Sequence, residues 1–236
     1  MKKHNRYLSL LPIYILVLTL FLLLAISGSR AVSVLSVNTP IKSTKIIVID
    51  AGHGGVDGGA TSCTDIPESQ YNLEIAMKLN DLMHLLGINT RMIRETNCSV
   101  YREGETIAQK KVSDLKERVR IVNNTENAFL VSIHQNYFSQ SKYNGAQVFF
   151  APSEGSKEIA LQLQNAFITY LNPGSKRSAK QANGIYLMQN IDRPGVLIEC
   201  GFLSNPKEAY LLSTPQYQQK LCAVIACTVS NALSAP

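Results

Sequence analysis

The sequence predicts an α/β fold, in which a mostly parallel sheet lies between two layers of helices. Short apolar runs rich in β-branched residues, such as residues 45–49 and 128–134, indicate strands buried on both faces. Longer segments with apolar residues at helical spacing separate these runs. Strands that alternate with helices favour a parallel sheet, which binds ligands at the carboxyl ends of its strands. We therefore expect a three-layer α/β/α domain with its functional residues at that edge.

The remaining elements follow from local patterns. Residues 65–86 predict a helix, because apolar residues recur every three or four positions up to Gly87, a typical residue just beyond a helix C-terminus. Asp65, followed three residues later by Glu68, resembles a capping box at the start of this helix. The other expected helices cover residues 112–125, 156–171 and 215–232, and the other expected strands cover residues 88–93, 145–150, 185–188 and 196–199.

The N-terminal residues predict export. Lys2, Lys3 and Arg6 precede residues 8–26, an almost wholly apolar stretch of nearly membrane-spanning length. Small residues follow, so a cleaved signal peptide and an uncleaved membrane anchor both fit, and the length of the stretch favours the anchor. We expect residues 1–30 to form this segment, residues 31–44 a linker and residues 45–236 one domain. The protein would then lie in the cell envelope and meet the membrane only through its N-terminal segment.

Composition narrows the class of partner. The chain of 236 residues has a net charge of +6 and a sequence pI of about 9.0, which fits a polyanionic partner such as the cell wall. Basic residues are scattered and no nucleic-acid-binding motif is present, so we expect no nucleic-acid partner. Two of the five cysteines, Cys63 and Cys98, fall in expected loops, and the sequence does not determine whether they pair. The chain has no Cys-x-x-Cys pair, which excludes a cysteine zinc ribbon.

A glycine-dense loop follows the first strand and carries a single histidine, His53. The spacing does not match a dinucleotide-binding fingerprint, since Asp57 stands where the third glycine belongs. It does not match a phosphate-binding P-loop either, because no Gly-Lys-Ser or Gly-Lys-Thr follows. The loop therefore holds an imidazole at a strand end, and histidine is the commonest metal ligand in proteins.

Three other residues are expected at the same edge. His134 ends a second strand, Glu199 ends a third, and Glu68 lies at the start of the first helix. Two imidazoles and one carboxylate form a catalytic zinc site that leaves a position for water, and a second carboxylate can take the proton of that water. Spacing alone leaves the roles of Glu68 and Glu199 exchangeable. Ligand type favours Zn²⁺ without excluding other divalent ions.

Four ordered motifs resemble the type 3 family of N-acetylmuramoyl-L-alanine amidases. They are Asp-Ala-Gly-His-Gly-Gly at residues 50–55, Glu68 opening a helix, Ser-Ile-His-Gln-Asn at residues 132–136, and Val-Leu-Ile-Glu-Cys-Gly-Phe-Leu-Ser-Asn at residues 196–205. The resemblance spans about residues 45–233. It implies a zinc-dependent amidase domain in which His53, Glu68 and His134 bind Zn²⁺ and Glu199 is catalytic.

The resemblance also suggests further residues, with departures from the family pattern. Gln135 stands where the family commonly has alanine, so we expect it to line the cleft and to affect substrate fit. Asn136, next in the chain, is a second candidate for substrate binding. Arg118 matches an arginine that the family often carries, which makes it either a substrate contact or part of a structural ion pair.

The implied reaction is hydrolysis of the amide bond between N-acetylmuramic acid and L-alanine in peptidoglycan. In its short architecture and its last motif the chain is similar to the CwlD-type amidases of spore formers, which implies a role in spore cortex maturation and muramic-δ-lactam formation. The sequence does not determine whether a regulatory protein partner activates the enzyme. The alternatives are a zinc peptidase or deacetylase on another wall substrate, and a non-catalytic wall-binding or activator protein. Analysis of the reaction products distinguishes an amidase from a peptidase or a deacetylase. The motifs contain every expected metal ligand and the catalytic base, which argues against a non-catalytic protein.

Overall fold

Within residues 45–234, the part of the chain that the computed structural model describes, six strands form one sheet in the order β2-β1-β3-β6-β4-β5. The strands are β1 (Ile46–Ala51), β2 (Thr90–Met92), β3 (Ala128–Asn136), β4 (Gln147–Phe150), β5 (Lys180–Gln181) and β6 (Gly195–Phe202). Neighbouring strands run parallel, except that β4 is antiparallel to β6. The predicted mostly parallel sheet is therefore confirmed.

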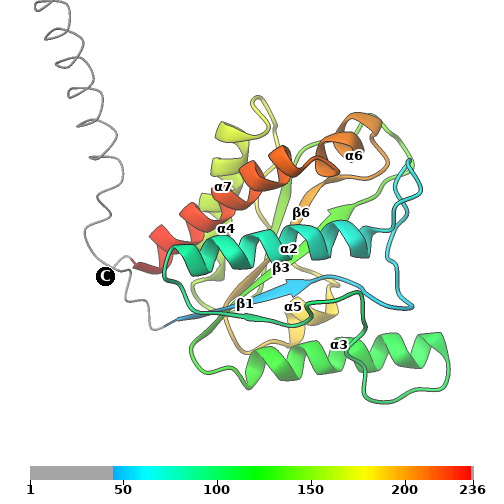
Figure 1. Ribbon diagram of the computed structural model, residues 1–236. Helices are drawn as coiled ribbons and strands as arrows, with labels where there is room; N and C mark the ends of the chain where they lie inside the picture. Colours follow the sequence, from blue (N-terminus) through cyan, green and yellow to red (C-terminus); the bar gives the residue numbers. More distant parts are fainter. Residues whose placement is uncertain (1–44, 235–236) are drawn as a thin grey trace, which may run out of the picture. The chain divides into compact units, whose positions relative to one another are not determined.

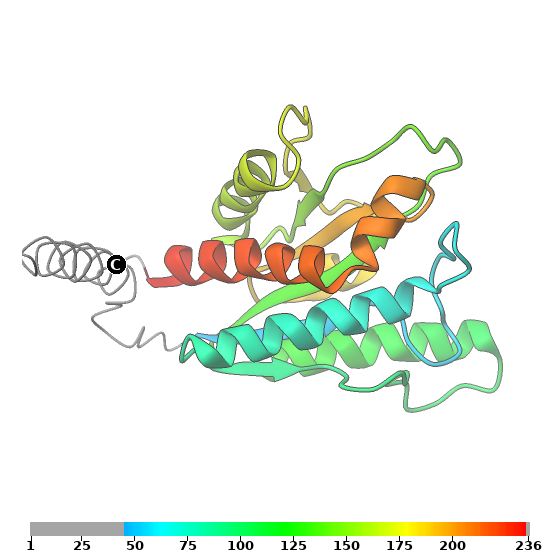
Figure 2. The same ribbon diagram turned by 45° about the horizontal axis from the view of Figure 1, so that its top comes forward.

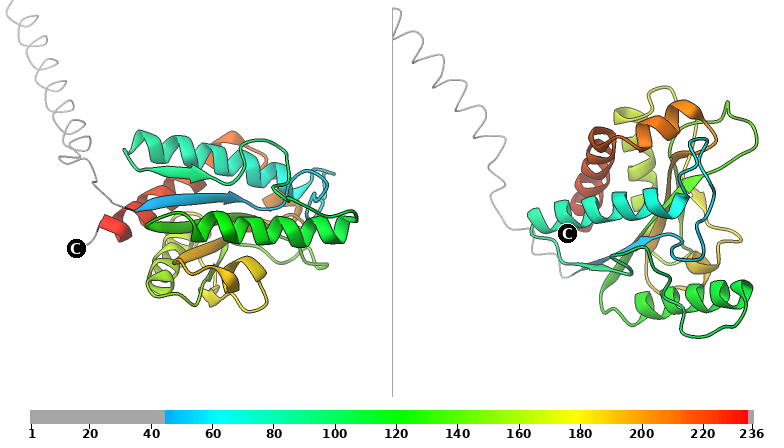
Figure 3. Two further views of the ribbon diagram at one scale, coloured as in Figure 1. Left: turned by 90° about the horizontal axis from the view of Figure 1, so that it is seen from below. Right: turned by 45° about the vertical axis from the view of Figure 1, so that its right-hand side comes forward.

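Helices cover both faces of the sheet (Figure 1). On one face lie α2 (Glu68–Leu85), α4 (Ser156–Tyr170) and α7 (Pro215–Ser234), with α7 packed against both α2 and α4 (Figure 2). On the other face lie α3 (Ile107–Asn123) and the short α5 (Tyr186–Asn190), which contact each other (Figure 3). A further short helix, α6 (Pro206–Leu212), follows β6. The expected three-layer α/β/α architecture is confirmed.

The alternation of side chains along the strands divides the core into two clusters. In β6, Val196 and Ile198 belong to the cluster under α2, α4 and α7, whereas Leu197 belongs to the cluster under α3 and α5. In a strand, residues two apart point to the same face of the sheet. Glu199 therefore faces the side of α3 and α5, as does His134, which lies four residues after Leu130 of the same cluster.

Two local predictions were wrong. The run at residues 185–188 forms the start of α5 rather than a strand, because a run of four apolar residues does not distinguish a strand from a buried turn of helix. The capping box at Asp65 is absent: Pro67 occupies the N-cap and makes no side-chain capping bond. The Glu68 carboxylate points instead toward two histidines.

The N-terminal predictions are not tested by this structure. The expected export segment at residues 1–30 and the linker at residues 31–44 lie outside the described residues. Among the helices that are described, none combines the length and the apolar character needed to cross a membrane.

Candidate metal centre

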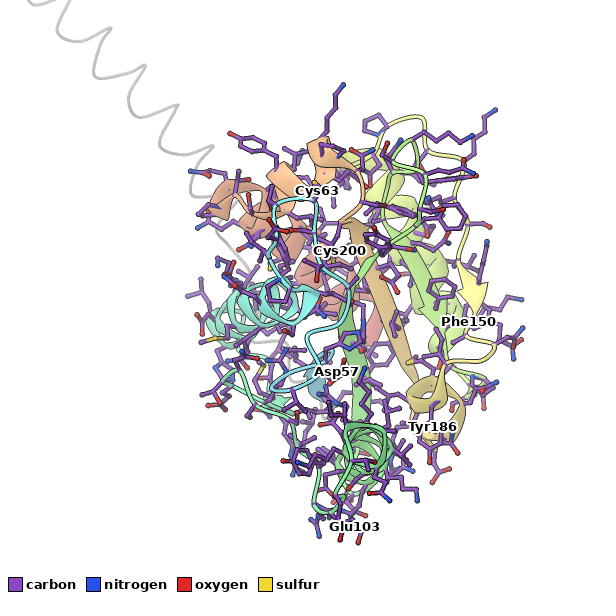
Figure 4. The ribbon with its side chains drawn as sticks, turned by 90° about the vertical axis from the view of Figure 1, so that its right-hand side faces the viewer. Asp57, Cys63, Glu103, Phe150, Tyr186 and Cys200 are labelled. Atoms are coloured by element: carbon purple, nitrogen blue, oxygen red, sulfur yellow. The ribbon has the colours of Figure 1, made fainter. Side chains whose placement is uncertain are left out.

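The residues predicted at separate strand ends meet at one edge of the sheet. His53 follows β1, Glu68 is the first residue of α2, and His134 and Glu199 are direct partners in the register of β3 and β6. Figure 4 faces this edge, with Asp57 of the glycine-dense loop near the centre of the view. The site is therefore assembled by the parallel order of β1, β3 and β6 together with the start of α2.

Three of these side chains form a cluster that could hold a metal ion. One ligand atom each from His53, Glu68 and His134 lies within 4.8 Å of the others. Nε2 of His53 is 3.2 Å from Oε2 of Glu68, and Nδ1 of His134 is 3.0 Å from Oε1 of the same carboxylate. The carboxylate that joins the two histidines is thus that of Glu68, and Glu199 lies outside this trio.

His53 is oriented through its second ring nitrogen. Nδ1 donates a hydrogen bond to Oδ2 of Asp57 at 2.9 Å. The other carboxylate oxygen of Asp57, Oδ1, forms an ion pair with Nζ of Lys111 at 2.7 Å. A carboxylate on one ring nitrogen fixes the tautomer and aims the other nitrogen, as in metal-binding histidines. Burial lowers the pKa of His53, but Glu68 and Asp57 outweigh burial and raise that pKa to about 9. The site thus attracts positive charge.

Glu68 is ionised despite being buried. Burial raises its pKa, but His134 and His53 outweigh this effect and hold the pKa well below its usual range. Backbone N–H groups also bond the carboxylate: Ala60 donates to Oε2 and Gln135 donates to Oε1, both at 3.1 Å. A carboxylate kept ionised between two imidazoles is a donor set suited to a divalent cation such as zinc.

Two glycines make room for this cluster. A Cβ atom at Gly52 would lie 2.2 Å from Nε2 of His134, and one at Gly59 would lie 2.6 Å from Oε2 of Glu68. Gly59 also has a positive φ of 70°, a conformation that residues with side chains rarely adopt. The glycine-dense loop therefore passes close to the side chains of the cluster, which leaves no room for a side chain at Gly52 or Gly59.

Replacing Gly52 with alanine should displace the His134 ring and weaken metal binding by more than about tenfold, in line with the sensitivity of metal sites to ligand orientation. Gly52 does not have a positive φ, so the effect would be steric alone. The measurement is zinc affinity by competition with a chromophoric chelator. Gly58→Ala is the control, because its nearest neighbour would be Cβ of Pro67 at 3.4 Å, an ordinary contact. Equal zinc affinity in both variants would contradict this account of Gly52.

Glu199 is chemically distinct from Glu68. Its Oε2 atom is buried and has no hydrogen-bond partner among the described residues. Burial raises the pKa of Glu199, the neighbouring His134 lowers it and Glu68 raises it, with the result that the pKa is about 7. A carboxyl group with this pKa can both accept and donate a proton near neutral pH.

Arg118 forms a buried ion-pair network. Its guanidinium pairs with Asp50 through Nη1 and with Asp114 through Nε, the latter at 2.6 Å. Its Nη2 also donates to the backbone carbonyl of His53 at 2.7 Å, where His53 has an unusual φ of 58°. Of the two roles proposed for Arg118, the structural ion pair is therefore present, and the substrate contact stays a prediction.

Gln135 and Asn136 differ in their positions. The Gln135 side chain is only 3% exposed and bonds to Asn72 of α2, so it lies beneath the site rather than on the cleft surface that we expected it to line. Asn136 ends β3 and is half-buried, and its role in substrate binding stays a prediction. Cys63 and Cys98 are both exposed free thiols.

Sequence reasoning missed the residues that support the cluster. Asp57 and Lys111 orient His53, and Asn72 donates to Oε1 of Glu68 at 3.1 Å. Arg94 donates from its guanidinium to four backbone carbonyls, including those of Ala51 and Gly52. Asn72 lies one helical turn after Glu68, a spacing that could have indicated contact. Asp57, Lys111 and Arg94 show no such spacing in the sequence, and only the folded chain brings them to the cluster.

A pocket of about 380 Å³ adjoins the cluster on the side of α3 and α5. Its lining includes His53, His134, Lys111, Tyr186 and Leu197. A more open hollow of about 690 Å³ lies at the start of α3, but its lining contains neither a residue of the cluster nor Glu199. Chemistry rather than size thus identifies the smaller pocket as the candidate active-site cleft.

The fold and this site define a class of protein. The family model described as N-acetylmuramoyl-L-alanine amidase matches residues 47–231, and the chain belongs to this family of peptidoglycan hydrolases. The predicted family, its fold and its amidase activity are confirmed.

Particular relatives are similar over most of their length. The chain is 38% identical over 227 residues to the germination-specific N-acetylmuramoyl-L-alanine amidase of Bacillus subtilis, covering 95% of this chain and 93% of the relative. Among solved structures, the CwlD amidase of Clostridioides difficile, in complex with the GerS lipoprotein, matches with a TM-score of 0.77 and 39% identity, covering 81% of this chain and 99% of that one. An N-acetylmuramoyl-L-alanine amidase of Clostridium difficile 630 matches with a TM-score of 0.70 and 29% identity, covering 82% and 99%.

Proposed function

We propose that this amidase is zinc-dependent, with His53, Glu68 and His134 as the zinc ligands and Glu199 as the catalytic base. The observation that carries the proposal is the approach of the three ligand atoms to within 4.8 Å, beside a buried carboxyl group with a pKa of about 7. The donor set fits the metal: two imidazoles and one ionised carboxylate, with Gly52 and Gly59 leaving room for them.

The roles of the residues follow from this arrangement. Zinc held there would supply a Lewis acid for the substrate carbonyl and would lower the pKa of water to about 7. Glu199 takes one proton from the attacking water and passes it to the nitrogen of the leaving L-alanine. The new bond joins the water oxygen to the lactyl carbonyl carbon, and the carbon–nitrogen bond breaks. The products are the lactyl carboxylate and a stem peptide with a free L-alanine amine.

The biological setting is proposed from the relatives. One is named germination-specific and another is a CwlD amidase, so we propose that this chain acts on spore cortex peptidoglycan, toward muramic-δ-lactam. The CwlD amidase of Clostridioides difficile was solved with a lipoprotein, which supports a protein partner for this chain as well. We also propose export through residues 1–30, a linker at residues 31–44 and a zinc-dependent amidase domain at residues 45–236.

Elemental analysis and product analysis test the proposal together. The full-length protein, purified in mild detergent, should hold one zinc ion per chain and release intact stem peptides with an L-alanine N-terminus, as detected by mass spectrometry. Release of shorter peptides or of acetate would instead indicate a peptidase or a deacetylase. Cortex peptidoglycan should be compared with vegetative peptidoglycan as substrate.

Replacing His53 or His134 with alanine should abolish both zinc binding and amidase activity, because two protein ligands hold a zinc ion far less tightly than three. Zinc content is measured after dialysis against metal-free buffer. His84→Ala is the matched control, since His84 is exposed on α2 and bonds Thr90. Full zinc retention in either ligand variant would remove that histidine from the ligand set.

A further inference from the structure

Behind Glu68, two buried amide side chains form a hydrogen-bonded chain that leads away from the metal cluster. Asn72 is fully buried and Gln135 is 3% exposed. Nδ2 of Asn72 donates to Oε1 of Glu68 and to the carbonyl of Gly52, both at 3.1 Å. Oδ1 of Asn72 accepts from Nε2 of Gln135 at 3.2 Å. The chain thus joins α2, the glycine-dense loop and β3 to one carboxylate.

The acceptors fix the direction of every bond in this chain. An ionised carboxylate and a backbone carbonyl can only accept, so Asn72 has to turn its NH₂ group toward Glu68 and Gly52. Its carbonyl oxygen then faces Gln135, which has to present its own NH₂ group in turn. The Oε1 atom of Gln135 is left pointing away, and among the described residues this buried atom has no partner.

The unpartnered atom has a consequence for the role of Gln135. A buried acceptor without a partner costs stability, and an apolar side chain of similar size would avoid that cost but would leave the buried Oδ1 of Asn72 without its donor. One unpartnered buried atom would remain in either case, so the amide at this position adds little to the stability of the fold. The amide of Gln135 does provide a hydrogen-bond donor for Oδ1 of Asn72. This bond fixes the orientation of the Asn72 side chain, whose NH₂ group then faces Glu68.

We propose that Asn72 and Gln135 are positioning residues for Glu68, which hold its carboxylate in the orientation that faces both histidines before a cation binds. The inference rests on the proposed function, in which Glu68 is a zinc ligand. Partners that orient a ligand side chain change metal affinity by about 10–100-fold when they are removed. Neither residue touches the substrate or the cation in this account.

Gln135→Met is the discriminating variant. It removes the donor to Asn72 and also the unpartnered oxygen, with little change in volume. We expect zinc affinity, measured by chelator competition, to fall by about tenfold. The urea midpoint of the metal-free protein should change little, because the unpartnered Oε1 atom is removed while Oδ1 of Asn72 loses its donor. Asn72→Leu should weaken zinc binding by about 10–100-fold and should also lower the midpoint, since Gly52 and Gln135 both lose a partner.

Gln218→Met is the matched control. Gln218 is also a buried amide that contacts α2, through Glu74, and it bonds the carbonyl of Leu212. This variant should lower the urea midpoint and leave zinc affinity unchanged. Unchanged zinc affinity in Gln135→Met and Asn72→Leu would overturn the positioning role, as would a loss of affinity in Gln218→Met equal to theirs. Failure of the unaltered protein to bind zinc would instead overturn the proposed function itself.

Discussion

Replacing Glu199 with glutamine should lower kcat by about 10²–10⁴-fold, or roughly 3–5 kcal/mol of activation free energy, while the zinc content stays at the level of the unaltered protein. The amide keeps the shape of the side chain but cannot take a proton from water. Steady-state kinetics on purified peptidoglycan, with metal analysis of the same samples, give both results. Loss of zinc would make Glu199 a ligand, and a near-normal rate would show that it is not the base.

The pH dependence of the unaltered enzyme provides a second check. A general base acts only as the carboxylate, so activity should fall as the pH drops through the pKa of Glu199, which is about 7 in the metal-free protein and is lowered by a bound cation. The acidic limb should be absent from the residual activity of Glu199→Gln. A limb that persists unchanged in this variant would belong to another group.

Glu199 should affect stability in the opposite direction from activity: as the pH rises, activity increases but the free energy of unfolding decreases. The pKa of Glu199 rises from 4.5 to about 7 on folding, so folding favours the protonated form, and stability is lost as the pH rises from 4.5 through 7. Glu199→Gln should therefore raise the free energy of unfolding of the metal-free protein at pH 8 by up to about 3 kcal/mol. Urea unfolding at pH 5 and pH 8 measures this difference.

Replacing Arg118 with methionine should destabilise the protein by about 3–5 kcal/mol, because it leaves the fully buried carboxylate of Asp50 without its cationic partner. Burial raises the pKa of Asp50, but Arg118 and the hydroxyl of Ser132 outweigh this effect and lower it. In the unaltered protein Asp50 thus contributes stability above pH 3.8, which is lost as the pH falls further. In the variant Asp50 has to take up a proton to stay buried, so the deficit should be larger at pH 8 than at pH 5.

Two controls separate the charge pair from a general effect of removing arginine. Arg120→Met removes a neighbouring exposed arginine whose only ion-pair partner among the described residues is Glu117, and the urea midpoint should change little. The double variant Asp50→Asn/Arg118→Met should recover part of the lost stability, because no unpaired buried charge remains. An Arg118→Met protein as stable as the Arg120→Met protein would contradict the role of this ion pair. Since Arg118 also bonds the carbonyl of His53, we expect weaker zinc binding in Arg118→Met.

Much of the fold could be predicted from local patterns. The β-branched run of β1 and the apolar run of β3 are buried on both faces, and such runs indicate strands without knowledge of their neighbours. The start of α3 was predicted five residues late, because the signal there is a capping box between Thr106 and Gln109 rather than an apolar pattern. α5 was mistaken for a strand because four apolar residues fit both structures.

By itself the sequence determined five of the six strands, the alternation of strands and helices, and the four residues that lie at one edge, because periodicity and residue type are local properties. Spacing left the roles of Glu68 and Glu199 open; the family resemblance implied that Glu68 is the one beside the two histidines, and the tertiary structure shows it there. Only the tertiary structure decided that Gln135 lies beneath the site instead of lining it. It also decided that Arg118 pairs with Asp50, which lies 68 residues away in the chain. These outcomes depend on side-chain orientation and on the order of β1, β3 and β6, which arise only when distant segments pack together.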